Sequence, residues 1–575
     1  MKWCNFFNKI SLILQALGCA VLYFVIEAIC RHSFTEAWTY MTTKPLVFAY
    51  NTAFIFTTML LVYLFRKRIF WRIFIGSLWL FLGIVNGVLL LNRVTPFTGP
   101  DVKNLTDGLS IAKKYLTQTQ MTIGAVLLGI AVLILLIILI KSPKYRGKLK
   151  YKVNIPLVLA GILAFGGITQ LALEKRVLSN YFGNIAIAYE DYGYPYCLAT
   201  TIFNTGISAP RDYSKNEIQK IENSEENLPE TKDGSHPNIL FLQLESFFDP
   251  TLVNYLDISE DPIPNFRKLM KEYSSGYLTV PAVGAGTANV EFEVMTGISA
   301  KFFGPGEYPY KSVLTEKTCE AAPYDFKQLG YGTHAIHNHR GAFYNRNKVF
   351  ANMGFDTFTC LEYMNNVMKT PKNWAKDSLL TEQILDALNS TEGSDYIYTI
   401  SVQGHGKYPT EQVIENPAIT VTQYQTEEQR WAYEYYANQI YEMDLFVKEL
   451  TDTLNNYDED VILVMYGDHL PALDMTEASM ADGSSIFQTQ YIVWSNFDMK
   501  KKNMDINAYE LNSEIMSRLG MSVGMMNKYQ QNYKDDINYK QNLKALSYDM
   551  LYGKRYIYGE TNPFKKTDLK MGVKD

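Results

Sequence analysis

Three short motifs beyond residue 237 of this 575-residue chain carry side chains suited to a metal site. The apolar run NILFLQLES reaches Glu245, and the run DVILVMYGDHLP contains Asp468 and His469. Between them, the glycine-rich loop at 284–286 leads into Thr287. Two carboxylates, one imidazole and one hydroxyl form a hard ligand set that suits manganese, magnesium or zinc better than copper or an iron–sulfur cluster.

Thr287 can be interpreted in two ways. Val290, Val294 and Met295 follow it at helical spacing until Gly297, so Thr287 lies at the start of a predicted helix. A threonine there can cap the helix by accepting free backbone N–H groups. It can also be a nucleophile, because a helix N-terminus favours negative charge and a bound metal lowers the pKa of a hydroxyl.

Histidines are sparse but clustered. The chain has seven, and five of them fall in three short segments of the second half. A single histidine of this kind is more often structural, but three clusters at predicted strand ends favour a functional site. Together with Arg346, the histidines outside the ligand set could neutralise a phosphate during transfer. The five are His334, His337, His339, His405 and His469.

From residue 237 onward, strand-like and helical patterns alternate. YGTHAIH and YIYTISVQG resemble strands, whereas 377–389 and 429–455 have helical periodicity. This alternation predicts an α/β domain with a mostly parallel central sheet, in which ligands bind beyond the carboxyl ends of the strands. Glu245, Asp468 and His469 lie at such ends.

The first 176 residues differ in texture from the rest. Five stretches are apolar over about 20 residues, the length that crosses a bilayer. They predict a five-helix transmembrane bundle. The stretches are 9–30, 45–65, 69–91, 121–140 and 154–173.

Basic residues predict the orientation of the bundle. Lys2 and Lys9, the RKR turn at 66–68 and the loop KSPKYRGKLKYK fall on one side of a five-span protein. The positive-inside rule makes that side cytoplasmic, so a cell-membrane, multi-pass protein with an extracellular catalytic domain is expected. The predicted organisation is a transmembrane domain at 1–176, an interfacial helix and polar linker at 177–236, and the outer domain at 237–575.

Composition excludes two other classes of protein. The net charge of −5 and the pI near 5.9 give no basic surface for nucleic acid. Six cysteines without a C-x-x-C pair are not typical of a disulfide scaffold or a thiolate zinc site.

With these motifs assembled, the chain resembles the lipoteichoic acid synthase family of the alkaline phosphatase/sulfatase superfamily. The Glu-Ser strand end, the glycine-rich loop before threonine and the Gly-Asp-His strand end occur in the family's order. The resemblance implies metal ligation by Glu245, Thr287, Asp468 and His469, with Thr287 as the nucleophile. Manganese is the implied ion.

The resemblance also implies a substrate. His337, Tyr344 and Arg346 match the segment that binds glycerol phosphate, and His405 matches a later histidine before an aromatic-proline pair. The implied reaction takes glycerol phosphate from phosphatidylglycerol, releases diacylglycerol, and delivers the group to a glycolipid, teichoic acid or related glycopolymer. We expect His405, or else His337, to protonate the leaving group.

Three departures bear on the substrate more than on the chemistry. Tyr344 replaces a usual tryptophan, His339 replaces a usual acidic residue, and the last motif continues as Leu-Pro. His339 could suit a more anionic substrate.

The alternatives to this function are transfer of phosphoethanolamine or another headgroup, phosphodiester hydrolysis, and a receptor or scaffold without activity. A sulfatase is disfavoured because neither C-x-P-S-R nor S-x-P-S-R occurs.

Overall fold

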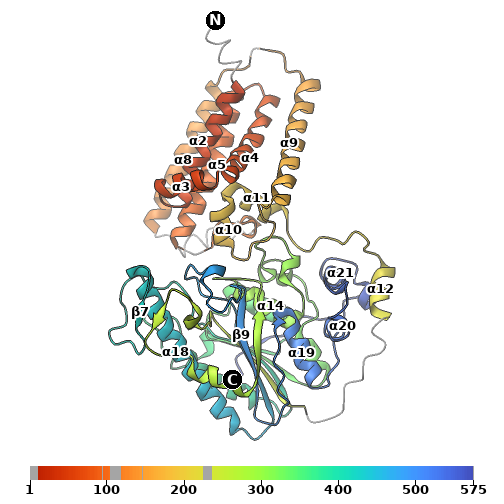
Figure 1. The fold of residues 1–575 in the computed structure, drawn as a ribbon. Helices are drawn as coiled ribbons and strands as arrows, with labels where there is room; N and C mark the ends of the chain where they lie inside the picture. Colours follow the sequence, from red (N-terminus) through yellow and green to blue (C-terminus); the bar gives the residue numbers. More distant parts are fainter. Residues whose placement is uncertain (1–10, 93–94, 104–117, 146, 224–235, 574–575) are drawn as a thin grey trace. The chain divides into compact units, whose positions relative to one another are not determined.

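The computed structural model describes the chain except residues 1–10, 93–94, 104–117, 146, 224–235 and 574–575 (Figure 1). The chain divides into two compact units, Met1–Thr205 with Gly304–Gly306, and Gly206–Phe303 with Glu307–Asp575. The domain boundaries expected from the sequence stay a prediction, and each unit is considered by itself.

Among its described residues, the first unit contains five helices that are long and apolar enough to cross a membrane. The five predicted spans are thereby confirmed as helices, to within a few residues at each end. Side chains of the fourth candidate span are not buried by protein, as expected for a surface that lipid covers. Lys2 and Lys9 lie outside the described residues. The helices are α2 (Ser11–Cys30), α4 (Pro45–Met59, continued by a 3-10 turn Leu60–Leu64), α5 (Arg68–Asn92), α8 (Gln118–Lys141) and α9 (Tyr151–Glu174).

Shorter helices complete this unit. The segment expected as an interfacial helix forms two, which share a core with the spans through Tyr194, Tyr196 and Leu198. Its placement at a membrane surface stays a prediction. The short helices are α3 (Phe34–Thr43), α6 (Gly99–Lys103), α10 (Ile185–Tyr192) and α11 (Tyr194–Phe203).

The second unit is built on a nine-stranded sheet in the order β10-β3-β9-β8-β1-β6-β4-β5-β11. Only β9 runs antiparallel to its neighbours, so the predicted mostly parallel sheet is confirmed. The strands are β1 (Asn238–Leu244), β3 (Ser274–Thr279), β4 (Gly332–His337), β5 (Thr357–Cys360), β6 (Asp395–Ile400), β8 (Val461–Gly467), β9 (Gln488–Ser495), β10 (Ile506–Asn507) and β11 (Lys570–Met571). A second, two-stranded sheet pairs β2 (Asp257–Ile258) with β7 (Val421–Gln423).

Both faces of the large sheet are buried. Along β1, Ile239 and Phe241 enter one core, whereas Leu240 and Leu242 enter the other. Alternation between two apolar layers explains why the strand reads as a continuous hydrophobic run. Helices α14 (Thr287–Thr296), α15 (Ala322–Gln328), α16 (Arg346–Met353), α19 (Leu511–Arg518), α20 (Met525–Tyr533) and α21 (Tyr539–Leu551) supply the first core; α13 (Pro264–Glu272), α17 (Leu380–Leu388) and α18 (Glu427–Asn455) supply the second.

One helix lies within the segment expected to be a polar linker. Helix α12 (Lys215–Asn223) buries Ile218 and Ile221 in the first core of the second unit. Two isoleucines three positions apart put one apolar stripe on an otherwise charged helix. The remainder of the expected linker, 224–235, lies outside the described residues.

Candidate active site

Strand register brings the predicted ligands together. Strands β1 and β8 are parallel neighbours, and Leu244 pairs with Gly467. The next residues, Glu245 and Asp468, therefore emerge side by side at the carboxyl edge of the sheet. Ligand atoms of Glu245, Asp468 and His469 all lie within 4.8 Å of one another, and all three residues are buried.

The glycine loop delivers Thr287 to this group. Helix α14 begins at Thr287, and its N-cap is Gly286 with a φ of 114°, a conformation that favours glycine. The capping interpretation of Thr287 is therefore wrong, because Gly286 holds the cap position and no side-chain cap bond forms. Instead, the Thr287 hydroxyl donates to Glu245 Oε2 at 3.0 Å and lies 3.5 Å from His469 Nε2.

The two carboxylate oxygens of Asp468 differ in their hydrogen bonding. Its Oδ1 accepts the backbone N–H groups of Ser246 (2.7 Å) and His469 (2.8 Å). Its Oδ2 is buried without a hydrogen-bond partner among the described residues, 3.5 Å from His469 Nε2. A buried carboxylate oxygen without a partner is costly, so a cation between these groups fits the residues present.

The tautomer of His469 follows from its other nitrogen. Nδ1 lies 2.9 Å from the Leu470 carbonyl oxygen, which can only accept, so Nδ1 carries the proton. Nε2 therefore presents a lone pair toward Glu245 and Asp468, as a metal-binding histidine does.

The charges of Glu245, Asp468 and His469 shift one another's pKa values. Burial and the neighbouring Glu245 raise the pKa of Asp468 to about 7. Burial would raise the pKa of Glu245 as well, but His405 and His469 hold it below its usual value. The pKa of His469 is raised, because the two carboxylates outweigh the effect of burial. A bound cation would stabilise the ionised forms of the two neighbouring carboxylates.

A second cluster contains His337, His339 and His405, three of the four other predicted histidines. His337 ends β4, and its ring centroid lies 5.7 Å from that of His339. The ring centroid of Trp374 lies 5.6 Å from that of His339 and 4.4 Å from that of His405. Burial and Arg346 lower the pKa of His339 to about 4, and the same two causes put the pKa of His337 well below its usual value.

His334 does not join this cluster. Its ring bonds Thr357 Oγ1 (2.8 Å) and Asp395 Oδ1 (3.1 Å), and Asp395 begins β6 at the opposite edge of the sheet. His334 is a satisfied structural histidine.

Arg346 forms a buried ion pair. Its Nε donates to Glu291 Oε2 at 3.0 Å, and its Nη2 pairs with Glu291 Oε1. Its Nη1 is buried without a hydrogen-bond partner among the described residues. Glu291 lies one turn after Thr287 on α14, so the same helix places the threonine and fixes the arginine.

Tyr344 lies beside a cation. Its ring stacks on Tyr308 with centroids 5.5 Å apart, and Lys311 Nζ is 4.8 Å from the centroids of both rings. The Arg346 guanidinium carbon is 5.3 Å from the Tyr344 centroid.

The loop that carries His405 packs tightly against β1. Ser401 Oγ accepts the Glu245 N–H at 2.9 Å. A Cβ on Gly404 would lie 2.1 Å from the Glu245 carbonyl oxygen, so this position requires glycine. Asp377 Oδ1 accepts from Asn338 Nδ2 (2.8 Å) and from the Val402 N–H (3.2 Å), which joins the ends of β4 and β6.

Comparison with known proteins agrees with this arrangement. Residues 237–521 match the Sulfatase family. The chain contains a Sulfatase domain. For residues 237–521, the predicted resemblance to the alkaline phosphatase/sulfatase superfamily is thereby confirmed.

Two proteins that are similar in sequence are informative. A Rhizobium meliloti (strain 1021) protein named for cyclic β-1,2-glucan modification is 29% identical over 410 residues, 64% of this chain and 63% of that protein. The capsular polysaccharide biosynthesis protein RkpI of the same organism is 26% identical over 263 residues, 45% of each chain. The matches span less than two thirds of either relative.

A solved structure shows the same fold. The Streptococcus pyogenes phosphoglycerol transferase GacH, in complex with sn-glycerol-1-phosphate, matches 63% of this chain and 100% of that chain. Its TM-score is 0.55 at 23% sequence identity.

The sequence analysis did not identify several residues around the candidate active site. Glu291 had a detectable signal, because it lies four residues after Thr287 on a predicted helix. Trp374 lies in an irregular loop, and Gln243 is hidden inside an apolar strand. Gln243 Nε2 nevertheless donates to the Thr287 carbonyl oxygen at 3.3 Å, and its Oε1 accepts from the Tyr398 hydroxyl at 2.8 Å.

Proposed function

We propose that this protein is a metal-dependent phosphoglycerol transferase that acts through a phosphothreonine intermediate on Thr287. The observation that carries the proposal is the Thr287 hydroxyl, which begins a helix, donates to Glu245 and lies 3.5 Å from His469 Nε2. A hydroxyl so placed has both a helix N-terminus and a ligand group to stabilise its anion.

Glu245, Thr287, Asp468 and His469 would hold the metal ion. Their oxygen-rich donor set fits Mn²⁺, and Mg²⁺ or Zn²⁺ as alternatives. When bound, the ion would lower the pKa of the Thr287 hydroxyl and offset negative charge on the phosphate.

In the first half-reaction, Thr287 Oγ, having lost its proton to solvent, attacks the phosphorus of phosphatidylglycerol. A bond forms between phosphorus and Oγ, and the bond between phosphorus and the diacylglycerol oxygen breaks. A histidine protonates that oxygen. In the second half-reaction an acceptor hydroxyl attacks the phosphothreonine, its proton leaves, and Thr287 is regenerated.

His405 is the preferred proton donor. His337 is the second choice, because its Nδ1 donates to the Ile400 carbonyl oxygen at 2.9 Å and its lowered pKa keeps the ring neutral. A neutral His337 offers the lone pair of Nε2, which suits a glycerol hydroxyl better than a leaving oxygen.

Arg346, Tyr344 and His339 would bind the glycerol phosphate together with His337 and His405. The partnerless Nη1 of Arg346 supports this role, because the Glu291 pair leaves that nitrogen available to a phosphate oxygen. His339 has an Nδ1 that is also buried without a partner among the described residues.

The donor would come from the outer face of the cytoplasmic membrane. Five candidate spans and basic loops at 66–68 and 141–152 support a cytoplasmic N-terminus and an extracellular catalytic unit. The acceptor would be a glycolipid, a teichoic acid or a related glycopolymer. Relatives named for glucan modification and capsular polysaccharide biosynthesis support a glycan acceptor.

The test uses purified full-length protein, Mn²⁺ and phosphatidylglycerol labelled in its acyl chains. Release of labelled diacylglycerol by the wild type and the Thr287→Ser variant, but not by Thr287→Ala, is the expected result. Equal release by wild type and Thr287→Ala would overturn the nucleophile. Release from phosphatidylethanolamine alone would replace the donor and make the protein a phosphoethanolamine transferase.

A further inference from the structure

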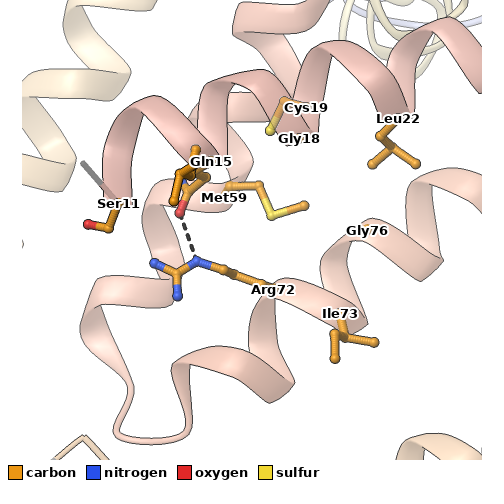
Figure 2. Close-up of a pocket in the computed structure, with 10 residues that line it drawn as sticks. Ser11, Gln15, Gly18, Cys19, Leu22, Met59, Arg72, Ile73 and Gly76 are labelled. Carbon is orange, nitrogen blue, oxygen red and sulfur yellow. Dashed lines mark hydrogen bonds between the residues drawn. The ribbon is translucent and has the colours of Figure 1, made fainter. Parts of the chain in front are cut away.

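An apolar groove lies in the membrane unit, far in sequence from the residues of the candidate site. It is formed by α2, the end of α4 and the first turns of α5, and its volume is about 430 Å³. That size is typical of a small-ligand site. Figure 2 shows the lining side chains on facing helices, with Leu22 and Ile73 toward one end and Gln15 with Arg72 toward the other.

At the polar end of the groove, Arg72 forms no ion pair with any of the described residues. Arg72 Nε donates to Gln15 Oε1 at 3.0 Å (Figure 2). Its Nη2 donates to the Tyr63 hydroxyl at 3.4 Å. Both partners are neutral. Gln15 is only 8% exposed, and its Nε2 is buried without a hydrogen-bond partner among the described residues. An arginine and an amide donor that lie side by side can both donate hydrogen bonds to an anion with several acceptor oxygens.

The position of these donors along the helices corresponds to the depth at which lipid headgroups lie. Arg72 is the fifth residue of α5, so it lies about 6 Å along the axis from the helix start. That is the interfacial region of a span, where anionic headgroups lie and basic pockets between helices bind them. Leu14, Cys19 and Leu22 continue along the groove on one face of α2.

We propose that this groove binds an anionic glycerophospholipid, with its phosphate on Arg72 and the Gln15 amide and an acyl chain along the apolar lining. An arginine in an otherwise apolar groove is expensive in a membrane unless an anion accompanies it. On the orientation proposed above, this lipid belongs to the cytoplasmic leaflet. It is then distinct from the donor lipid, which the catalytic unit meets on the outer face.

Gly18 provides a way to close the groove. It lines the groove, and a Cβ built on it meets no atom within 4 Å. A leucine there would project into the space that the acyl chain needs, without displacing protein atoms at its Cβ. Gly167 in α9 has the same open surroundings but does not line the groove, so Gly167→Leu is the matched control.

The test places full-length protein in phosphatidylcholine vesicles that contain a phosphatidylglycerol with a photoreactive diazirine in its acyl chain. After irradiation, labelled residues are located by peptide mass spectrometry. Labelling should concentrate on the groove residues of α2 and α5. It should fall about tenfold in Gly18→Leu and in Arg72→Gln, the change that corresponds to about 1.4 kcal/mol of binding. Gly167→Leu should label as the wild type does.

Three results would overturn the proposal. They are labelling spread evenly over all five spans, labelling unchanged in both groove variants, and equal labelling of the groove by a diazirine phosphatidylcholine. Because the readout is the position of the label and not diacylglycerol release, failure here leaves the proposed reaction unaffected. Failure of the reaction likewise leaves this site unaffected.

Discussion

The Thr287 hydroxyl donates a hydrogen bond to the Glu245 carboxylate at 3.0 Å, although 42 positions separate the two residues in the chain. The bond links the first turn of α14 to the end of the central strand β1. It places the hydroxyl beside the proposed metal ligands, whereas Gly286 holds the helix cap. The chemistry proposed for this protein depends on that link.

Removing one charge from the ligand group should abolish metal binding while the fold is retained. In Asp468→Asn, the oxygen that accepts two backbone N–H groups can stay, whereas the partnerless oxygen becomes an amide, a poor ligand for a hard cation. Metal content of the purified protein, measured by elemental analysis, should fall from one ion to none. Asp444→Asn is the control, because Asp444 is buried and also accepts two backbone N–H groups, at the start of α13. Metal retained in Asp468→Asn would remove Asp468 from the ligand set.

The buried pair Arg346–Glu291 should behave as a unit. Arg346→Met or Glu291→Met alone leaves one buried charge unpaired and should cost about 3–5 kcal/mol of unfolding free energy. The double variant should cost less, because no charge is left without a partner. A denaturant unfolding series on the four proteins measures this coupling.

The same four proteins separate a structural role of Arg346 from a substrate role. If Arg346 binds the phosphate, the double variant stays inactive even though its stability recovers, and its metal content is unchanged. Full activity in the double variant would show that Arg346 serves only the fold.

Gly404→Ala should damage the site without touching a proposed ligand. The added methyl would lie 2.1 Å from the Glu245 carbonyl oxygen, so either the His405 loop or the Glu245 backbone must move. Displacement of about 1 Å can lower a rate about a hundredfold. The measurement is kcat for diacylglycerol release, with Gly393→Ala as control, since a Cβ there meets its nearest atom only at 3.9 Å. Equal rates for the two variants would mean that the loop position is unimportant.

Glu293 on α14 should make the protein less stable as pH rises. Burial raises its pKa to about 8, although Ala300 N–H and the Ser299 hydroxyl donate to its Oε1 at 2.8 and 3.0 Å. The unfolded chain loses this proton near pH 4.3, before the folded protein does. The contribution of Glu293 to stability is therefore fully present below about pH 4.3 and falls until about pH 8, by a few kcal/mol.

Glu293→Gln keeps an acceptor oxygen for both donors and removes the titration. Its advantage in thermal unfolding midpoint over the wild type should be absent near pH 4 and should grow up to about pH 8. A difference between the two proteins that does not change with pH would contradict this account. Glu307→Gln, at another buried carboxylate of the same unit, controls for general effects of removing a charge.

The proximity of Glu245, Thr287 and Asp468 was predictable because each residue follows a strong local pattern. Glu245 and Asp468 end long apolar runs, and Thr287 follows glycines that can turn the chain into a helix. The strand register that makes Glu245 and Asp468 neighbours is not a local property, but parallel sheets bring the carboxyl ends of their strands to one edge. The five spans were predictable for the same reason, since length and hydropathy suffice.

The partners of these residues were not predictable in the same way. The sequence predicts that Arg346 binds phosphate. Its ion pair with Glu291 depends on how α14 and α16 pack, which no local sequence pattern indicates. Trp374 lies in a loop without periodicity, and its position between His339 and His405 depends on three separate segments. His334 looked like a member of the histidine cluster by sequence, yet three residues of strand carry it away from His337 to the opposite edge.

The order of the strands separates two kinds of change that the protein can undergo during evolution. Neighbouring strands β1 and β8 lead to the carboxylates and His469, whereas β6 and β4 lead to the loops with His405 and with His339 and Tyr344. Loops after β4 and β6 can lengthen or exchange aromatic and basic residues while the ligand group stays fixed by its own strands. On the proposed function, divergence in substrate among relatives should therefore concentrate in those two loops. Grafting the loops between relatives is then a route to new substrates that preserves the proposed reaction.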